Sequence, residues 1–143
     1  YRFAWVRDAA FTAQALAAVG HRPEALAFLD WLEATSLRRA AAAPPGGGAA
    51  GVLRVLYPLR DGVALDERVL DHLEGYGGAR PVRIGNGAAE QFQLDIYGEL
   101  LAAADQITRL GGTLPAPLWR FLARVADECC ARWREPDEGI WEV

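Results

Sequence analysis

Residues 87–134 read GAAEQFQLDIYGELLAAADQITRLGGTLPAPLWRFLARVADECCARWR, and this stretch decides the fold class. Apolar residues recur in it every three or four positions, which predicts one helix over about 87–110 and another that starts at Thr113 or at Pro115-Ala116 and runs to Arg134. Gly111 and Gly112 separate the two helices, since glycine readily ends a helix. The predicted buried stripes consist of Ala89, Phe92, Ile96, Tyr97, Leu100, Leu101, Ala104 and Ile107 in the first helix, and of Leu118, Phe121, Leu122, Val125, Cys129 and Trp133 in the second.

A second pair of helices is predicted upstream of this stretch. Small and apolar residues repeat at helical spacing over 4–19 and again over 23–42. Gly20 ends the first of these helices and Pro23 lies at the start of the second, as their backbone preferences favour. Two helix pairs, each joined by a short Gly-containing turn, indicate a helix bundle or a helical barrel.

The segment between the two pairs follows a different pattern. Residues 52–57 (VLRVLY) allow one short strand or hairpin, and the rest of 51–86 is rich in Gly, Pro and charge. A long irregular segment inside a compact protein is uncommon and is often functional. The sequence therefore predicts an all-α fold with one long irregular segment.

Composition limits the classes of function. The chain has 143 residues, 52% of them apolar, which is enough for the core of one domain. Its 15 basic and 19 acidic residues give a net charge of −4, which argues against a nucleic-acid partner. No stretch reaches the roughly 18 to 20 apolar residues that a membrane span requires. The adjacent Cys129 and Cys130 suit reduced thiols, so we expect a cytoplasmic protein.

We expect neither a metal site nor a cofactor. His21 and His72 have no cysteine or second histidine at metal-ligand spacing, so both are predicted to be solvated or structural. Ser36, the only serine, lacks the glycine pattern of a nucleophile elbow. Carboxylates and arginines are therefore the groups left to carry chemistry.

Three stretches contain such groups, and each has a structural alternative. In Trp5-Val6-Arg7-Asp8 a cation and an anion lie beside an aromatic ring, which suits a pyranose with its paired hydroxyls and apolar face. The alternative is that Asp8 caps a helix. In the run 80–91, two arginines and an Asn-Gly turn suit the wall of a site, or Asn86 caps the following helix.

The third stretch, 137–142 (DEGIWE), packs three carboxylates around Trp141. A carboxyl group held against an indole is desolvated, which raises its pKa towards the range of a general acid. The alternative is an acidic surface loop.

The order of these stretches resembles glycoside hydrolase family 15, especially its bacterial glucoamylase-like and trehalase-like members. The resemblance spans the chain and depends on the motifs at 1–9 (YRFAWVRDA), 73–76 (LEGY), 80–99 (beginning RPVRIGN) and 133–143 (WREPDEGIWEV). It implies an (α/α)6 barrel with its active site at one end, and hydrolysis of α-glucosidic bonds from a non-reducing end with inversion.

The resemblance also implies roles for individual residues. Glu142 matches the general acid that protonates the departing oxygen. Arg7 and Asp8 match the pair that grips the released glucose. The remaining sugar-binding residues that it implies are the aromatics Tyr1, Trp5 and Trp141 and the loop arginines Arg80 and Arg83.

We therefore expect residues 1–143 to form part of an incomplete (α/α)6 barrel that lacks its C-terminal half, including the general base. The expected substrate is an α-glucoside, with maltooligosaccharides first and α,α-trehalose as the alternative. A second alternative is a non-catalytic helical module or degenerate relative. The sequence does not indicate an oligomeric state.

The isolated chain should be catalytically inactive and should expose apolar helix faces, since an inverting hydrolase needs a second carboxylate across the sugar ring. Glucose release from trehalose or maltose by the purified chain, measured against a buffer blank, tests this expectation. Release above the blank would contradict it.

Overall fold

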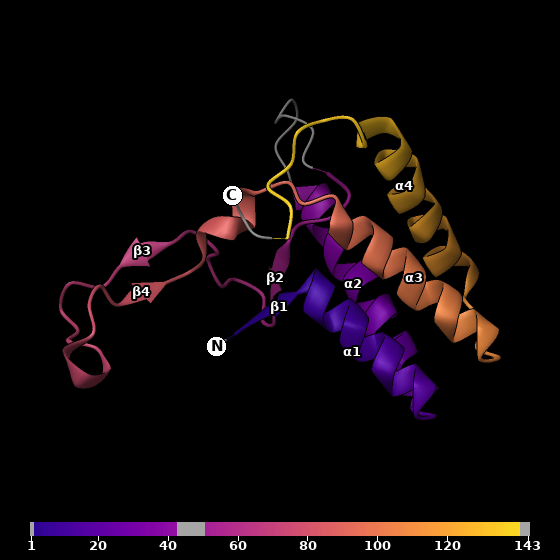
Figure 1. Ribbon diagram of the computed structural model, residues 1–143, viewed down its shortest axis with the longest axis horizontal. Helices are drawn as coiled ribbons and strands as arrows, with labels where there is room; N and C mark the ends of the chain where they lie inside the picture. The colour runs from indigo at the N-terminus through magenta and orange to yellow at the C-terminus, as the bar shows by residue number, and fades with distance from the viewer. Residues whose placement is uncertain (1, 43–50, 141–143) are drawn as a thin grey trace.

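Four helices form the main body of the computed structural model, which describes residues 2–42 and 51–140. They are α1 (Val6–Ala18), α2 (Arg22–Ala42), α3 (Asp95–Arg109) and α4 (Ala116–Arg132). Helix α1 packs on α2 and α3, and α3 packs on α4 (Figure 1). The prediction of two helix pairs in a mostly helical chain is confirmed.

The core lies where α1, α2 and α3 meet and continues under α4. Burial of one large apolar side chain contributes about 1.5–3 kcal/mol, so these residues account for much of the stability of the helical body. The largest fully buried core side chains include Tyr57, Tyr97, Phe121, Leu29, Leu32, Leu100, Ile107 and Leu118.

A short sheet connects the start of the chain to the middle segment. Strand β1 (Phe3–Trp5) pairs antiparallel with β2 (Leu56–Pro58), with Ala4 opposite Tyr57. The Tyr57 hydroxyl forms a 2.9 Å hydrogen bond with buried Ser36 of α2. The strand expected over 52–57 therefore lies at 56–58, and its tyrosine ties the sheet to the helical body.

Two predicted helix starts are wrong. The first helix begins at Val6 instead of residue 4, because Phe3–Trp5 satisfies its backbone by pairing with β2. The third begins at Asp95 instead of residue 87: residues 87–90 form a 3-10 turn, η2 (Gly87–Glu90), and 91–94 are irregular. Ala89 and Phe92 therefore precede the helix in whose stripe they were predicted.

An arm made of residues from the middle segment projects from the helical body (Figure 1). It contains a hairpin of β3 (Arg68–Val69) and β4 (Arg83–Ile84), and a 3-10 turn, η1 (Tyr76–Gly78), lies between these strands. This second strand pair was not predicted. Tyr76 is 99% exposed, so the arm holds little core of its own.

Large apolar side chains remain on the outer faces of the helices, as expected. Phe11 of α1 is 48% exposed and Trp119 of α4 is 63% exposed. Trp119 lines an open, largely apolar hollow of about 300 Å³ between α3 and α4. None of the helices in 2–42 and 51–140 is long and apolar enough to cross a membrane.

Two glycines provide a matched test of this packing. A Cβ on Gly112 would meet the Ile107 carbonyl oxygen at 2.8 Å, whereas a Cβ on Gly98 inside α3 would meet nothing within 4 Å. In thermal unfolding of the full-length protein, Gly112→Ala should cost about 1–3 kcal/mol. Gly98→Ala should add about 0.5–1 kcal/mol, because alanine favours the helix. Equal effects of the two substitutions would contradict the turn geometry.

Candidate functional site

Arg7 lies in the first turn of α1 and points to the start of α3. Its Nε donates to Asp95 Oδ2 at 2.5 Å, and its Nη2 donates to Asp95 Oδ1 at 3.2 Å. The side chains of Arg7 and Asp95 are only 11% and 29% exposed. Such a bidentate, charge-assisted pair fixes both the position and the plane of the guanidinium group.

Gln93 supplies a second acceptor for Arg7. Its Oε1 accepts from Arg7 Nη2 at 2.5 Å, and its Nε2 donates to Gln91 Oε1 at 2.8 Å. Gln93 is 0% exposed, so its amide depends on these partners for the hydrogen bonds that it would otherwise make with water. The amide is thereby held with its oxygen towards Arg7.

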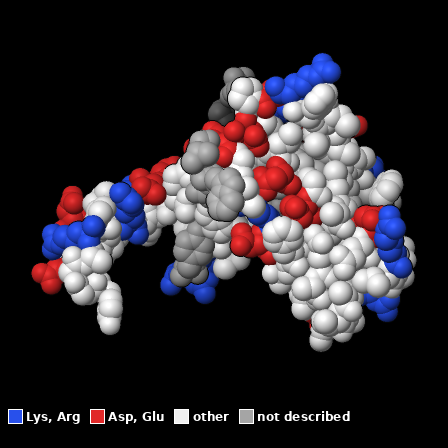
Figure 2. Space-filling model, in the orientation of Figure 1, with Lys and Arg blue, Asp and Glu red and all other residues white. Residues whose placement is uncertain are grey.

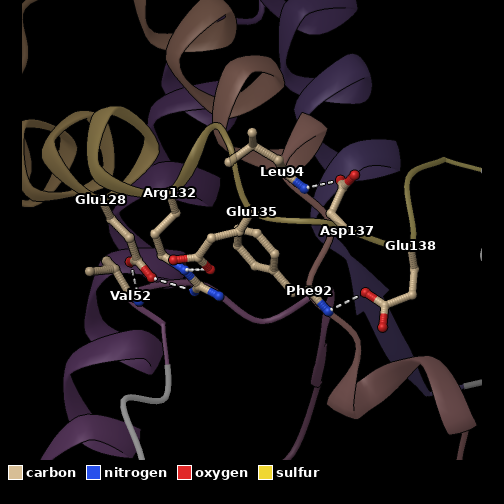
Figure 3. A network of polar contacts seen from close by, with 8 residues as sticks. All are labelled: Val52, Phe92, Leu94, Glu128, Arg132, Glu135, Asp137 and Glu138. Atoms are coloured by element: carbon tan, nitrogen blue, oxygen red, sulfur yellow. Dashed lines mark hydrogen bonds and ion pairs between the residues drawn. The ribbon is translucent and has the colours of Figure 1, made fainter.

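The backbone of the same segment is held from its other side by the C-terminal loop (Figure 3). Glu138 accepts from the Phe92 amide at 2.9 Å, and its own amide donates to the Phe92 carbonyl at 3.0 Å. Asp137 accepts from the Leu94 amide at 2.8 Å. Residues 91–95 therefore turn side chains to Arg7 and amides to the loop.

A further cluster stabilises the end of α4 beside Phe92 (Figure 3). Arg132 donates to Glu128 at 3.1 Å and to Glu135 at 2.8 Å, and its guanidinium lies 3.6 Å from the centre of the Phe92 ring. Glu128 also accepts from the Val52 amide at 2.5 Å. The hydrogen bond to Glu135 is the main cause of the raised pKa of Arg132.

Around Arg7, the structure describes two more of the predicted sugar-binding residues. Trp5 is half-buried at the end of β1, where its side chain packs on a small cluster containing Leu56 and Ala88. Asp8 is exposed in the first turn of α1. The N-cap residue of this helix is Trp5, so Asp8 does not occupy the capping position that the structural alternative gave it.

The two predicted loop arginines lie elsewhere, on the arm. Arg83 of β4 pairs with Glu67 at 3.3 Å. Arg80 is exposed and lines a shallow hollow of about 290 Å³ together with Pro81 and Leu73. The strands β3 and β4 of the arm project away from α1, the helix that carries Arg7 (Figure 1). The structural alternative for this loop was that Asn86 caps the helix that follows. Asn86 does cap the 3-10 turn η2, because its Oδ1 accepts from the Ala88 amide at 2.8 Å.

Tyr1, Trp141 and Glu142 lie outside the described residues. Figure 2 shows acidic side chains gathered on the face where the arm meets the helical body. Among residues 2–42 and 51–140, no group of three or more His, Cys, Asp or Glu side chains is arranged to hold a metal ion.

Sequence reasoning missed the roles of Gln93 and Asp95. The apolar residues Phe92 and Ile96 on either side fit a helical period, which hid the irregular segment before α3. Asp95 lies at the first position of α3, where an acidic residue is favoured, but the helix predicted from residue 87 placed it inside a helix and hid this signal.

The comparison with known proteins covers the chain from end to end. Residues 1–143 match the family model described as Glycosyl hydrolases family 15. Three relatives are trehalases from Thermoplasma volcanium and Mycobacterium tuberculosis and trehalase 1 from Sulfolobus acidocaldarius, at 36%, 39% and 33% identity over 99–100% of this chain. The chain spans only 20–24% of their lengths. No solved structure matches the chain significantly.

Removing the Glu138 carboxylate should loosen the segment before α3. We expect Glu138→Ala to cost about 1–3 kcal/mol and to speed hydrogen exchange at the Phe92 amide, because that partly buried donor loses its acceptor. Hydrogen exchange of the full-length protein measures this effect, with Glu33→Ala on α2 as the control. Unchanged protection of Phe92 would contradict the assigned contact.

Proposed function

This chain belongs to glycosyl hydrolases family 15, and we propose that the protein of which it forms part hydrolyses α,α-trehalose to two glucose molecules. The observation that carries this proposal is the match of the whole chain to the family model, together with the trehalase relatives at 36–39% identity. Their names favour trehalose over the maltooligosaccharides that the sequence motifs put first. In this proposal, residues 1–143 form part of an (α/α)6-barrel catalytic domain.

We assign the grip on the glucosyl unit to the first turn of α1. Arg7 supplies guanidinium donors from a side chain that Asp95 and Gln93 hold in one orientation. Asp8, the next residue, supplies an exposed carboxylate acceptor. A fixed donor and a fixed acceptor side by side match the adjacent hydroxyls of a pyranose. Trp5, and Tyr1 outside the described residues, offer aromatic surface for the apolar face of the ring.

Glu142 serves as the general acid in this proposal. Its carboxyl proton passes to the bridging oxygen while the bond from that oxygen to the anomeric carbon breaks. Water attacks the opposite face of the anomeric carbon and loses its proton to a second carboxylate, roughly 6.5–9.5 Å from the acid in inverting enzymes. This single attack from the opposite face inverts the configuration at the anomeric carbon. We place the general base outside residues 1–143.

The contacts of the C-terminal loop favour Glu142 over its acidic neighbours. Asp137 and Glu138 already accept hydrogen bonds from the Leu94 and Phe92 amides. Both carboxylates are therefore engaged in holding the backbone of the segment before α3. The same bonds fix the loop four residues before Glu142 to the segment that holds Arg7. We propose Trp141 as a further sugar contact beside the acid.

We also propose Arg80 and Arg83, which lie on the arm, as sugar-binding residues. Both are exposed, and Arg83 is oriented by Glu67. Because β4 belongs to the arm and Arg7 to α1, we assign both arginines to a part of the substrate other than the glucosyl unit at Arg7.

In the full-length protein, Glu142→Gln should lower kcat on trehalose by about 10² or more, because the amide keeps the shape of the acid and lacks its proton. Glucose release from trehalose and from maltose should be measured side by side for both proteins. Asp105→Asn, at an exposed pair with Arg109 on α3, is the control and should keep full activity.

Wild-type activity on maltose alone would replace trehalose as the substrate. Full activity of Glu142→Gln would remove the acid assignment. Absence of wild-type activity on both sugars would favour a non-catalytic module.

A further inference from the structure

The segment 91–95 faces two parts of the molecule at once. Its side chains at 93 and 95 contact Arg7 on α1, and its amides at 92 and 94 are bound by Glu138 and Asp137 (Figure 3). Gln91 is extended and Leu94 already has helical backbone angles, so the chain turns into α3 within this short segment. The sugar-binding arginine and the loop that leads to the proposed acid therefore share one support.

We propose that Asp95 and Gln93 are positioning residues, which act on the substrate only through the Arg7 guanidinium. This inference rests on the proposed function, because it takes Arg7 as a sugar-binding residue. Neither residue needs to contact sugar itself.

The geometry supports this role because each partner removes a different freedom of Arg7. An arginine side chain has many rotamers, and ordering them on substrate binding costs free energy. The bidentate contact with Asp95 at 2.5 and 3.2 Å fixes the plane of the guanidinium, and Gln93 fixes the direction of Nη2. Arg7 is thus ordered before the sugar arrives.

The burial of Gln93 separates this arrangement from an ordinary surface ion pair. A fully buried amide with both ends occupied, by Arg7 and Gln91, cannot rotate without losing both hydrogen bonds. If position 93 served only to fill the core, an apolar side chain would occupy the same space without polar atoms that need hydrogen-bond partners. The polar choice at position 93 is explained by the acceptor that it presents to Arg7.

A double-mutant cycle in the full-length protein tests the inference. The proteins compared are wild type, Asp95→Asn, Arg7→Ala and the double variant, with kcat/KM measured on trehalose and thermal unfolding measured for each. Asp95→Asn should lower kcat/KM by about 10- to 100-fold, because a small misplacement of a binding group costs that much. In the Arg7→Ala background the same change should have less than about a 3-fold effect.

Glu128→Gln serves as the matched control, since Glu128 is also a partly buried carboxylate paired with an arginine, Arg132. It should lower the unfolding temperature, and any effect on kcat/KM should be equal in the two Arg7 backgrounds. Gln93→Met, which keeps the volume and removes the amide, is the second test variant and should behave as Asp95→Asn does.

Loss of kcat/KM on Asp95→Asn by the same factor in both backgrounds would overturn the positioning role, and so would full activity of Asp95→Asn. If Asp95→Asn fails to fold, Gln93→Met decides by the same comparison. The wild-type protein distinguishes these results from failure of the proposed function. If wild type itself releases no glucose from trehalose, both the proposed function and the positioning role are wrong. The inference is supported if Asp95→Asn or Gln93→Met lowers kcat/KM strongly in the wild-type background and only slightly in the Arg7→Ala background.

Discussion

The contact between the Arg7 guanidinium and the Asp95 carboxylate is the constraint on which the rest of the site depends. It joins the first turns of α1 and α3, which lie 88 residues apart in the chain. Leaving either charge alone in this partly buried place would be costly, so the two helix starts must stay together. The apolar core brings these helices side by side, and this contact sets their register.

Glu128, Glu135, Asp137 and Glu138, four acidic residues of the described C-terminal region, divide into two groups by their partners. Glu128 and Glu135 hold Arg132 at the end of α4, and Asp137 and Glu138 hold backbone amides before α3. All four are thereby committed to fixing the fold. Among the acidic residues of the loop after α4, this leaves Glu142 as the acid in the proposed mechanism.

The sequence predicted the helices but not the segment that makes the site. Helical periodicity identified all four helices because each buries one apolar stripe, and Gly20 and Gly111 correctly marked two of their ends. The same periodicity extended the third helix back to residue 87, because Ala89 and Phe92 fit the helical spacing although they pack in the core from outside the helix. The contacts of Arg7 with residues 93 and 95 were not predictable, since no local pattern pairs residues 88 positions apart. The motif resemblance predicted the family correctly and ranked the substrates differently from the relatives' names.

A crystal structure of the full-length protein with glucose bound is the most direct test of the roles proposed for Arg7 and Glu142. If Asp95 and Gln93 position Arg7 for sugar binding, a guanidinium nitrogen of Arg7 should lie within about 3.2 Å of a sugar hydroxyl. Arg7 should keep its contacts with Asp95 and Gln93 in this complex. The carboxyl group of Glu142 should face the anomeric carbon of the same sugar. Glucose bound away from Arg7 would contradict the binding role of this residue. An Arg7 side chain that leaves Asp95 to reach the sugar would contradict its positioning by Asp95.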